Sequence, residues 1–359
     1  MHRTGTATLP LHSGPAPRWL FARMVRLGRA ILFALVEDLG PRGVLRRLSD
    51  PFWFQALGCL LGFDWHSSGL TTTVCGALKE AVHGAERDLG IFVVGGKGRV
   101  ARATPQELQR YGDRFGVDAD ALIRCSRLSA KVDNSAVQDG YDLYHHTFFA
   151  ALDGSWAVVQ QGMRALDRTA RRYHWLGEAV RSFTCEPHAA VCCDVRTPTL
   201  NLVAVEAQPV REAVAALARE RPERLVSEFQ RVLVMPGRHA VRLEDLHPRR
   251  LHAVLLRTYQ TQAPDFERLL GIPGVGAKTL RALALLSELL AGTPLSWRDP
   301  ARYSFAHGGK DGHPYPVDRA TYDRTVATLE DALRRARMGE PDRLEALRRL
   351  HRLVRPATP

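Results

Sequence analysis

The hydrophobic pattern of this chain changes its period once, close to residue 205. Before that point, runs rich in β-branched and aromatic residues alternate with helical segments, whereas from Gln208 onward leucine, alanine and arginine recur at helical spacing only. The 359 residues are enough for two domains of about 150 residues each. We therefore predict an α+β fold with an antiparallel hairpin over residues 1–205 and an all-helical domain over residues 206–359, divided between residues 205 and 240.

The hairpin is the clearest local signal in the first domain. Two β-rich runs over residues 141–162 meet at Asp153-Gly154, a dipeptide that tolerates the positive φ of a tight turn. Side chains alternate between the two faces of a strand. His145 and His146 are therefore expected on opposite faces of the sheet.

Other turn and strand signals place the flanking elements. Gly40 and Pro41 stop an amphipathic helix that starts about twenty residues earlier. A second, shorter strand pair is predicted over residues 188–195 and 200–207. After that pair, the pattern predicts helices alone.

The charge of the chain favours a polyanionic partner. Fifty basic residues against 38 acidic ones give a net charge of +12, and lysine supplies only five of the 50. Such an excess is typical of proteins that bind nucleic acid. Arginine richness also follows from genome composition, so charge alone does not decide the partner.

Composition excludes several classes of protein and site. No apolar run reaches the roughly 20 residues of a membrane span, and the N-terminus lacks the apolar segment of a secretory signal. We therefore expect a cytoplasmic protein that makes no membrane contact. The six cysteines show no CxxC spacing, so structural zinc is not expected, and no nucleotide cofactor is expected either. The oligomeric state stays open.

Residues 266–291 read as a helix, a glycine-rich turn and a second helix. This segment resembles the helix-hairpin-helix motif that binds DNA. In that motif the turn glycines let the backbone approach a phosphate, and amides at the start of the second helix point toward it without reading base sequence. The resemblance implies a nucleic-acid-binding set made of Ile272, Gly274, Val275, Gly276, Lys278 and Thr279.

A weaker resemblance extends to helix-hairpin-helix DNA glycosylases of the endonuclease III type. It implies Lys278 as a nucleophile on the sugar and Asp318 as the carboxylate that stabilises the developing positive charge. They lie 40 residues apart, which is farther than that family leads us to expect. A phosphate contact is therefore favoured for Lys278 over a catalytic one.

The first domain holds a second set of candidate catalytic residues. Asp133 and Asp139 precede a strand that carries His145 and His146. Carboxylates with a histidine suit a Mg²⁺ or Mn²⁺ site for phosphodiester cleavage, because the oxygens bind the ion and the imidazole activates water. We predict Asp133, Asp139 and His146 as metal ligands, with one of the two histidines at the site. A hydrogen-bonded structural network or a nucleic-acid groove is the alternative.

Across its length the chain is similar to the family catalogued as domain of unknown function 763. The resemblance rests on strings from both halves, among them RTGTATLPLH, SRLSAKVDNSAVQDGYDLYHH and HGGKDGHPYPVDRATYD. It implies kinship without an activity. From the residues we predict a DNA-binding, DNA-processing enzyme that cleaves the backbone with a divalent metal, with glycosylase or lyase chemistry and non-catalytic DNA binding as the alternatives.

Overall fold

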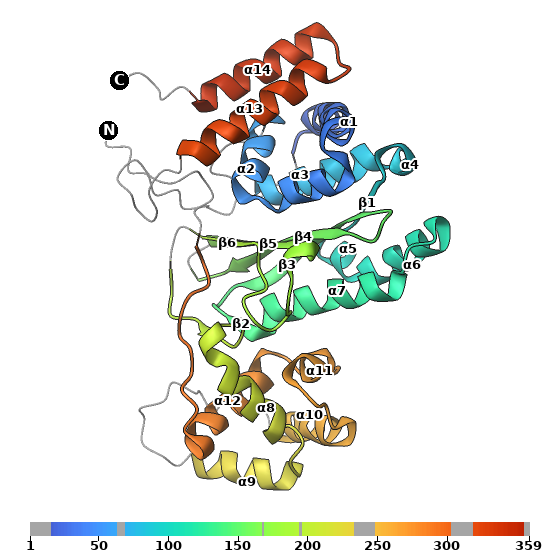
Figure 1. The fold of residues 1–359 in the computed structure, drawn as a ribbon. Helices are drawn as coiled ribbons and strands as arrows, with labels where there is room; N and C mark the ends of the chain where they lie inside the picture. Colours follow the sequence, from blue (N-terminus) through green and yellow to red (C-terminus); the bar gives the residue numbers. More distant parts are fainter. Residues whose placement is uncertain are drawn as a thin grey trace, which may run out of the picture.

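The computed structural model describes residues 16–62, 69–166, 169–193, 196–232, 248–302 and 319–354. Its elements form a stack, with a five-stranded antiparallel sheet in the middle and a group of helices at each end (Figure 1). The chain is therefore a mixed α/β protein with an antiparallel sheet, as the strand and helix signals predict.

The sheet has the strand order β1-β3-β4-β5-β6, and every neighbouring pair is antiparallel. The predicted hairpin is confirmed, because β3 pairs with β4 and Gly154 adopts a φ of 85° in the turn. The strands are β1 (Ile91–Lys97), β3 (Asp142–Ala151), β4 (Trp156–Arg164), β5 (Thr169–Leu176) and β6 (Ala190–Cys192).

Successive side chains of β3 enter different cores, as the period of a strand requires. Phe149 belongs to the core under the first helices, whereas Phe148 belongs to the core on the other face. The helices of the first core are α1 (Arg18–Ser49), α2 (Pro51–Leu60) and α3 (Gly69–Val82), with the short α4 (Glu86–Leu89) beside them. The opposite face is covered by α5 (Arg99–Arg102), α6 (Thr104–Phe115) and α7 (Ala119–Lys131).

The predicted end of the first helix is confirmed in its backbone. Gly40, with a φ of 67°, is not helical and divides α1 into two pieces, with Pro41 opening the second. The predicted short strand pair, in contrast, is wrong. β6 pairs with β5, and β7 (Leu200–Asn201) instead pairs with β2 (Val137–Gln138). The pattern of a strand does not by itself specify its pairing partner. In the structure β6 adds to the large sheet beside β5.

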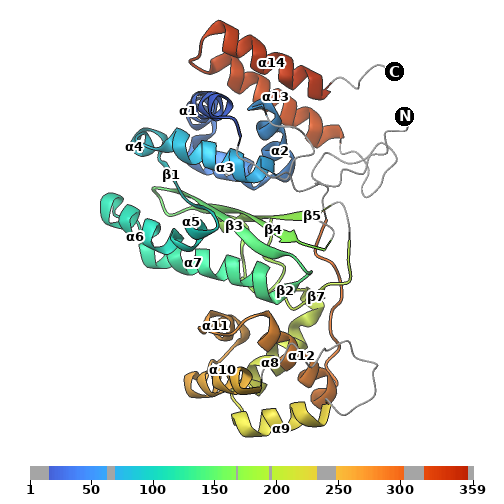
Figure 2. The ribbon, with the colours of Figure 1, turned by 180° about the vertical axis from the view of Figure 1, so that it is seen from behind.

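After residue 208 the described residues form helices and loops without a strand. Five of these helices group at one end of the stack, namely α8 (Gln208–Leu217), α9 (Pro222–Val232), α10 (Pro248–Thr261), α11 (Phe266–Gly271) and α12 (Ala277–Ala291). In both views α7 lies between the sheet and this group (Figure 1, Figure 2).

The last two helices differ from the predicted division at residues 205–240. α13 (Arg319–Arg335) and α14 (Glu340–Val354) pack on α1 and α2, at the opposite end of the stack from α8–α12 (Figure 2). Their leucines Leu329, Leu333 and Leu350 are buried in the same core as the N-terminal helices. An apolar helix face packs against any complementary face within reach, so helical pattern alone does not assign these helices to a domain.

Among the described residues, no helix has both the length and the apolar character needed to cross a membrane. The short helical turns that complete the described fold are η1 (Val132–Ala136), η2 (Gly177–Ala179) and η3 (Val205–Ala207).

Candidate functional site

A groove of about 1670 Å³ separates the sheet and α7 from the turn between α11 and α12. One wall comes from α7 and the start of β3, and the other comes from α10, α11 and residues 271–277. This volume exceeds the roughly 300–1,000 Å³ of a typical small-molecule pocket. The groove therefore suits an extended ligand.

Basic side chains dominate the charged lining of the groove. Six cationic residues line it, against the two acidic residues Asp120 and Glu267. The cations stand on both walls, so a polyanion in the groove meets positive charge from two sides. They are Arg102, Arg124, Arg127, Lys131, Arg257 and Arg268.

The predicted nucleic-acid-binding turn forms part of this groove. Gly274 is exposed, and its φ of 94° is one that residues with a side chain rarely adopt. Gly276 has extended backbone, and a Cβ there would meet no atom within 4 Å. Ile272, Val275 and Thr279 turn their side chains inward, with exposed fractions of 5%, 0% and 7%. At these three positions only the backbone is left to contact a ligand.

Several hydrogen bonds hold the turn against α7 and β2. Lys131 donates from Nζ to the carbonyl oxygen of Val275 at 2.5 Å, and Gln138 donates from Nε2 to the carbonyl oxygen of Ala277 at 2.8 Å. Arg124 of α7 also forms an ion pair with Glu267 of α11. Burial lowers the pKa of Lys131. These contacts fix the spacing of the two walls, so the groove exists before any ligand enters.

At the floor of the groove, Ser126 and His146 face each other. The Oγ of Ser126 lies 2.9 Å from Nε2 of His146, and both residues line the groove. Nδ1 of His146 lies 2.9 Å from Oε1 of Gln160 on the next strand. Burial lowers the pKa of His146 to about 4, so the imidazole is neutral at neutral pH.

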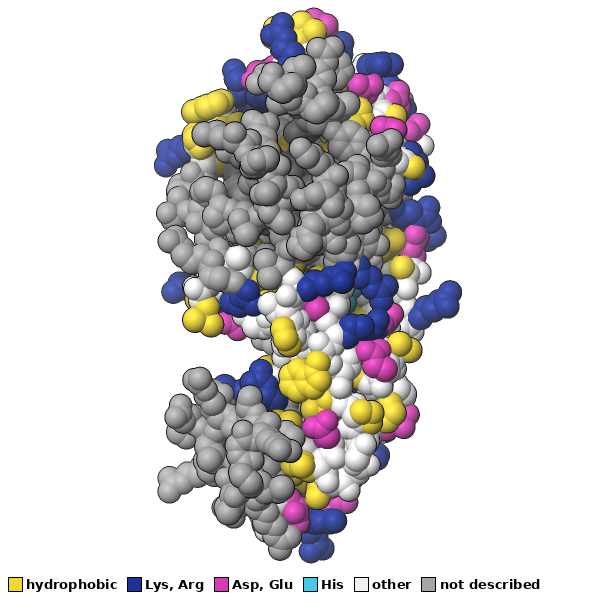
Figure 3. Space-filling view, turned by 90° about the vertical axis from the view of Figure 1, so that its left-hand side faces the viewer, with side chains coloured by type: hydrophobic (Ala, Val, Ile, Leu, Met, Phe, Trp, Pro, Cys, Tyr) yellow, Lys and Arg dark blue, Asp and Glu magenta, His cyan; other side chains and the backbone are white. Residues whose placement is uncertain are grey.

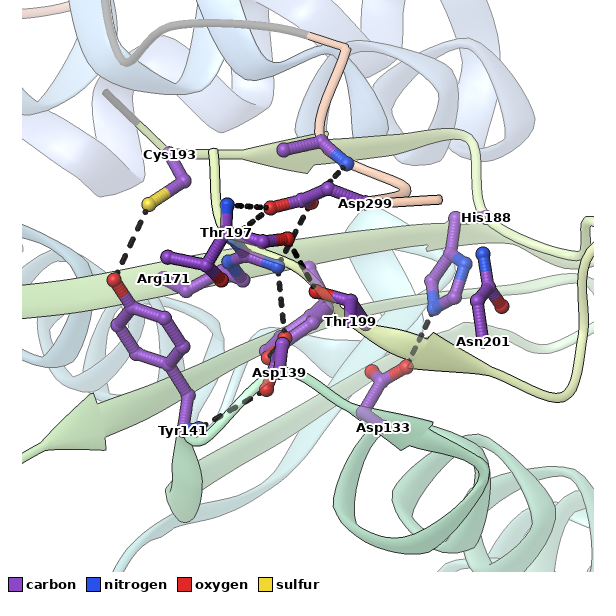
Figure 4. A network of polar contacts seen from close by, with 12 residues as sticks. Asp133, Asp139, Tyr141, Arg171, His188, Cys193, Thr197, Thr199, Asn201 and Asp299 are labelled. Carbon is purple, nitrogen blue, oxygen red and sulfur yellow. Dashed lines mark hydrogen bonds and ion pairs between the residues drawn. The ribbon is translucent and has the colours of Figure 1, made fainter. Parts of the chain in front are cut away.

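Asp133 lies fully buried behind Gln160. Its Oδ2 accepts hydrogen bonds from Nε2 of Gln160 at 2.5 Å and from Nε1 of Trp175 at 2.9 Å. Its Oδ1 lies 2.5 Å from Nε2 of His188 (Figure 4). Burial raises the pKa of Asp133. The carboxylate thus ends a hydrogen-bonded chain that runs from the groove through His146.

His145 points to the other side of β3, as the alternation of the strand predicts. Its Nε2 lies 2.9 Å from Oγ1 of Thr147 on the same strand. Its Nδ1 is buried and has no hydrogen-bond partner among the described residues. Burial lowers its pKa to about 3. His145 therefore does not share the hydrogen-bonded chain of His146.

Asp139 belongs to a different network from Asp133. Its Oδ2 accepts hydrogen bonds from Nη1 of Arg171 at 3.0 Å and from the hydroxyl of Tyr173 at 2.6 Å, and its Oδ1 accepts one from the amide of Tyr141 at 3.0 Å. Figure 4 shows Arg171 standing between this carboxylate and that of Asp299.

In the structure the predicted metal ligands are all engaged by protein groups. The carboxylate of Asp139 forms an ion pair with the buried guanidinium of Arg171. Both ring nitrogens of His146 already lie within hydrogen-bond distance of protein groups. Within the part of the chain that the structure describes, no group of three or more His, Cys, Asp or Glu side chains is placed to hold a metal ion. The donor set of Asp133, Asp139 and His146 therefore does not fit a metal site in this arrangement.

Of the predicted glycosylase pair, the structure describes Lys278 but not Asp318. Lys278 is exposed in the first turn of α12 and is not among the residues that line the groove. Asp318 lies outside the described residues. The geometry of a glycosylase pair is therefore not defined by the described part of the chain, and the pairing stays a prediction.

A second basic area lies on the side of the molecule where residues 292–302 run along the sheet edge. Lys and Arg side chains gather there with acidic ones among them (Figure 3). Arg298 pairs with Glu186 and Glu206, and Arg302 pairs with Glu186. Because these arginines are neutralised by their neighbours, the groove is the stronger candidate for a polyanion.

Sequence reasoning did not select Ser126 as a site residue. The signal is visible in hindsight, because Leu122, Ser126, Ser129 and Asp133 recur at spacings of four, three and four residues. Such spacing marks the buried face of a helix, and three of these four side chains are polar. Polar groups on a buried helix face need specific partners, and those partners came from the strands.

The comparisons with known proteins give a family and no activity. A family model described as "Protein of unknown function (DUF763)" matches residues 5–317. No curated protein and no solved structure matches the chain.

Proposed function

The chain belongs to the DUF763 family, whose description assigns no activity, and from the groove we propose that it binds the sugar-phosphate backbone of a nucleic acid, DNA in the first instance. The excess of six basic over two acidic lining residues carries this proposal. Phosphate contacts of this kind grip the backbone and leave base sequence unread.

The individual cations have different parts in this proposal. Arg127 and Arg268 are exposed on facing walls and offer planar donor groups to phosphate oxygens. Arg257 donates from Nη1 to the carbonyl oxygen of Pro273 at 2.6 Å, which holds its guanidinium beside the turn. Lys131 donates a hydrogen bond to the carbonyl oxygen of Val275 and thereby connects the two walls of the groove.

The turn before α12 supports the same function. α12 has 15 residues, and its N-cap residue, Gly276, has no side chain that could cap the helix. The positive end of the helix dipole at this turn therefore favours an anion there. Since a side chain at Gly276 would meet open space, a phosphate can reach the backbone there.

We propose that the protein processes DNA, because the second domain would bind the nucleic acid while a histidine and a serine lie at the floor of the groove. Binding is tested by fluorescence anisotropy with labelled single-stranded DNA, duplex DNA and RNA between about 50 and 200 mM salt. We expect affinity to fall steeply with salt and to vary little with base sequence.

The matched variants are Arg127→Ala and Arg257→Ala in the groove and Arg348→Ala as control. Arg348 is an exposed arginine of α14, at the opposite end of the stack. The groove variants are expected to weaken every nucleic acid and to reduce the salt slope by about one each, with the control unchanged. Equal binding by the groove variants and the control would show that the polyanion binds elsewhere.

A further inference from the structure

Ser126 and His146 meet where a bound backbone would pass. Ser126 projects from α7 and His146 from β3, and both contribute to the surface of the groove. The distance of 2.9 Å between Oγ and Nε2 is that of a hydrogen bond between a hydroxyl and an imidazole. A nucleophile within reach of a base is the arrangement that nucleophilic catalysis requires.

The buried chain behind His146 fixes which nitrogen carries the proton. The oxygen of Asp133 accepts from Nε2 of Gln160, so the amide oxygen of Gln160 faces His146. An amide oxygen only accepts, and therefore Nδ1 of His146 carries the hydrogen. Nε2 is left with its lone pair toward Ser126, whose hydroxyl must donate. The carboxylate thus sets the tautomer that a general base needs.

The same network fixes the ring in position. Asp133 is held by Trp175 and His188 besides Gln160; the contacts with Trp175 and Gln160 are buried, and the contact with His188 is partly buried. A base whose orientation is set by a second and a third group recurs in hydrolases that activate serine. Here an amide stands between the base and the carboxylate, so Gln160 and Asp133 are positioning residues.

We infer that Ser126 is the nucleophile, and His146 the general base, of a phosphodiester transesterification in the groove. The inference rests on the proposed function, because the basic walls must deliver the phosphodiester to Ser126. It names the reaction of the site: cleavage of the backbone through a covalent link between protein and nucleic acid.

The cleavage step balances without a further reactant. Oγ of Ser126 attacks phosphorus, the Oγ–P bond forms, and the bond from phosphorus to one sugar oxygen breaks. The hydroxyl proton passes to Nε2 of His146 and then to the departing sugar oxygen. The products are a phosphodiester that joins Ser126 to one strand end and a free hydroxyl on the other. Water or a sugar hydroxyl then attacks phosphorus, the Oγ–P bond breaks, and the proton of the attacking hydroxyl passes through Nε2 of His146 to Oγ of Ser126.

The experiment incubates the full chain with labelled single-stranded, duplex and nicked oligonucleotides in the presence of EDTA. Denaturing gels and intact-protein mass spectrometry detect a covalent adduct, and digestion locates the modified residue. The variant is Ser126→Ala, and Ser129→Ala is the matched control. Ser129 is a buried serine one turn further along α7, whose hydroxyl donates to the carbonyl oxygen of Ser126.

We expect an adduct at Ser126 in the wild type and in Ser129→Ala, and no adduct in Ser126→Ala, because alanine has no hydroxyl that could bond to phosphorus. Anisotropy on the same oligonucleotides separates the two proposals. Normal binding without an adduct or cleavage on any of these substrates overturns the role of Ser126 and leaves the groove as a binding site. Cleavage that persists in Ser126→Ala overturns it as well, and absence of binding overturns the proposed function itself.

Discussion

The guanidinium of Arg171 forms two hydrogen bonds with the carboxylate of Asp299, which lies 128 residues later in the chain. The distances are 3.0 Å and 2.7 Å, and the same guanidinium also binds Asp139. The amides of Thr197 and Ala301 donate to the carboxylate of Asp299 as well (Figure 4). This cluster ties the segment after α12 to the sheet.

Arg171→Met should therefore destabilise the fold strongly. The variant leaves Asp139 and Asp299 buried without their cation, and removing one partner of a buried ion pair typically costs about 3–5 kcal/mol. Urea unfolding measures the loss. Arg298→Met is the control, because its exposed ion pairs are worth at most about 1 kcal/mol. Similar losses in both variants would contradict the structural weight given to Arg171.

Gly276→Val tests the backbone approach at the turn. Gly276 has extended backbone and open space around its Cα, so valine is expected to fold with little change in melting temperature. Its side chain would occupy the space proposed for a phosphate. We expect affinity for every nucleic acid to fall by roughly tenfold or more, because the variant would lose a charge-assisted hydrogen bond to a phosphate. Unchanged affinity in a well-folded variant would remove the turn from the interface.

Lys131 and Arg127 should separate stability from binding. Lys131→Met loses the hydrogen bond to the carbonyl oxygen of Val275, so we expect unfolding at lower urea, by about 1.5–3 kcal/mol. Arg127→Met, on the exposed face of α7, should keep the stability and lose affinity instead. Urea unfolding and anisotropy on both variants check this. The reverse pattern would show that Lys131 binds phosphate and Arg127 supports the fold.

Acid should destabilise the protein through its buried histidines. The pKa of His146 falls from 6.5 to about 4 on burial, so below pH 6.5 the unfolded chain takes up a proton that the folded chain refuses. The contribution of the neutral His146 to the free energy of unfolding is fully present above pH 6.5. It is lost as the pH falls toward 4, by roughly 3 kcal/mol in total. His145 adds a loss of the same sign.

Urea unfolding from pH 7 to pH 4.5 measures this loss. His146→Asn lacks the titrating ring, so its stability should fall less steeply, by up to about 1.36 kcal/mol per pH unit. Parallel pH curves for the variant and the wild type would mean that His146 is not buried as the structure has it.

Local sequence signals specified the hairpin and the break at Gly40 because both depend on short-range backbone preference. Asp153-Gly154 permits the positive φ of a tight turn, and alternation along β3 then sends His145 and His146 to opposite faces. Neither result depends on the rest of the chain. The strand partner of β6 does depend on it, and the pattern did not identify that partner.

The sequence predicts several residues of the candidate site but not which of them lie together. Asp133, His146 and the turn at Gly274 were selected from the sequence, but their grouping was not. Asp139, only six residues after Asp133, pairs with Arg171, whereas Ser126, seven residues before Asp133, reaches His146. Proximity along the chain is a poor guide here, because Ser126 on α7 and Asp133 on η1, which continues α7, are both buried and bond to residues of the sheet.

The sequence by itself determined the helical and strand periods, the basic charge and the glycine turn, since these are properties of short segments and of composition. Only the tertiary structure decided that the turn before α12 stands opposite α7 and that α13 and α14 return to the N-terminal helices. Those pairings depend on which apolar faces and buried polar groups complement each other across more than a hundred residues, as Lys131 and Val275 do at a separation of 144.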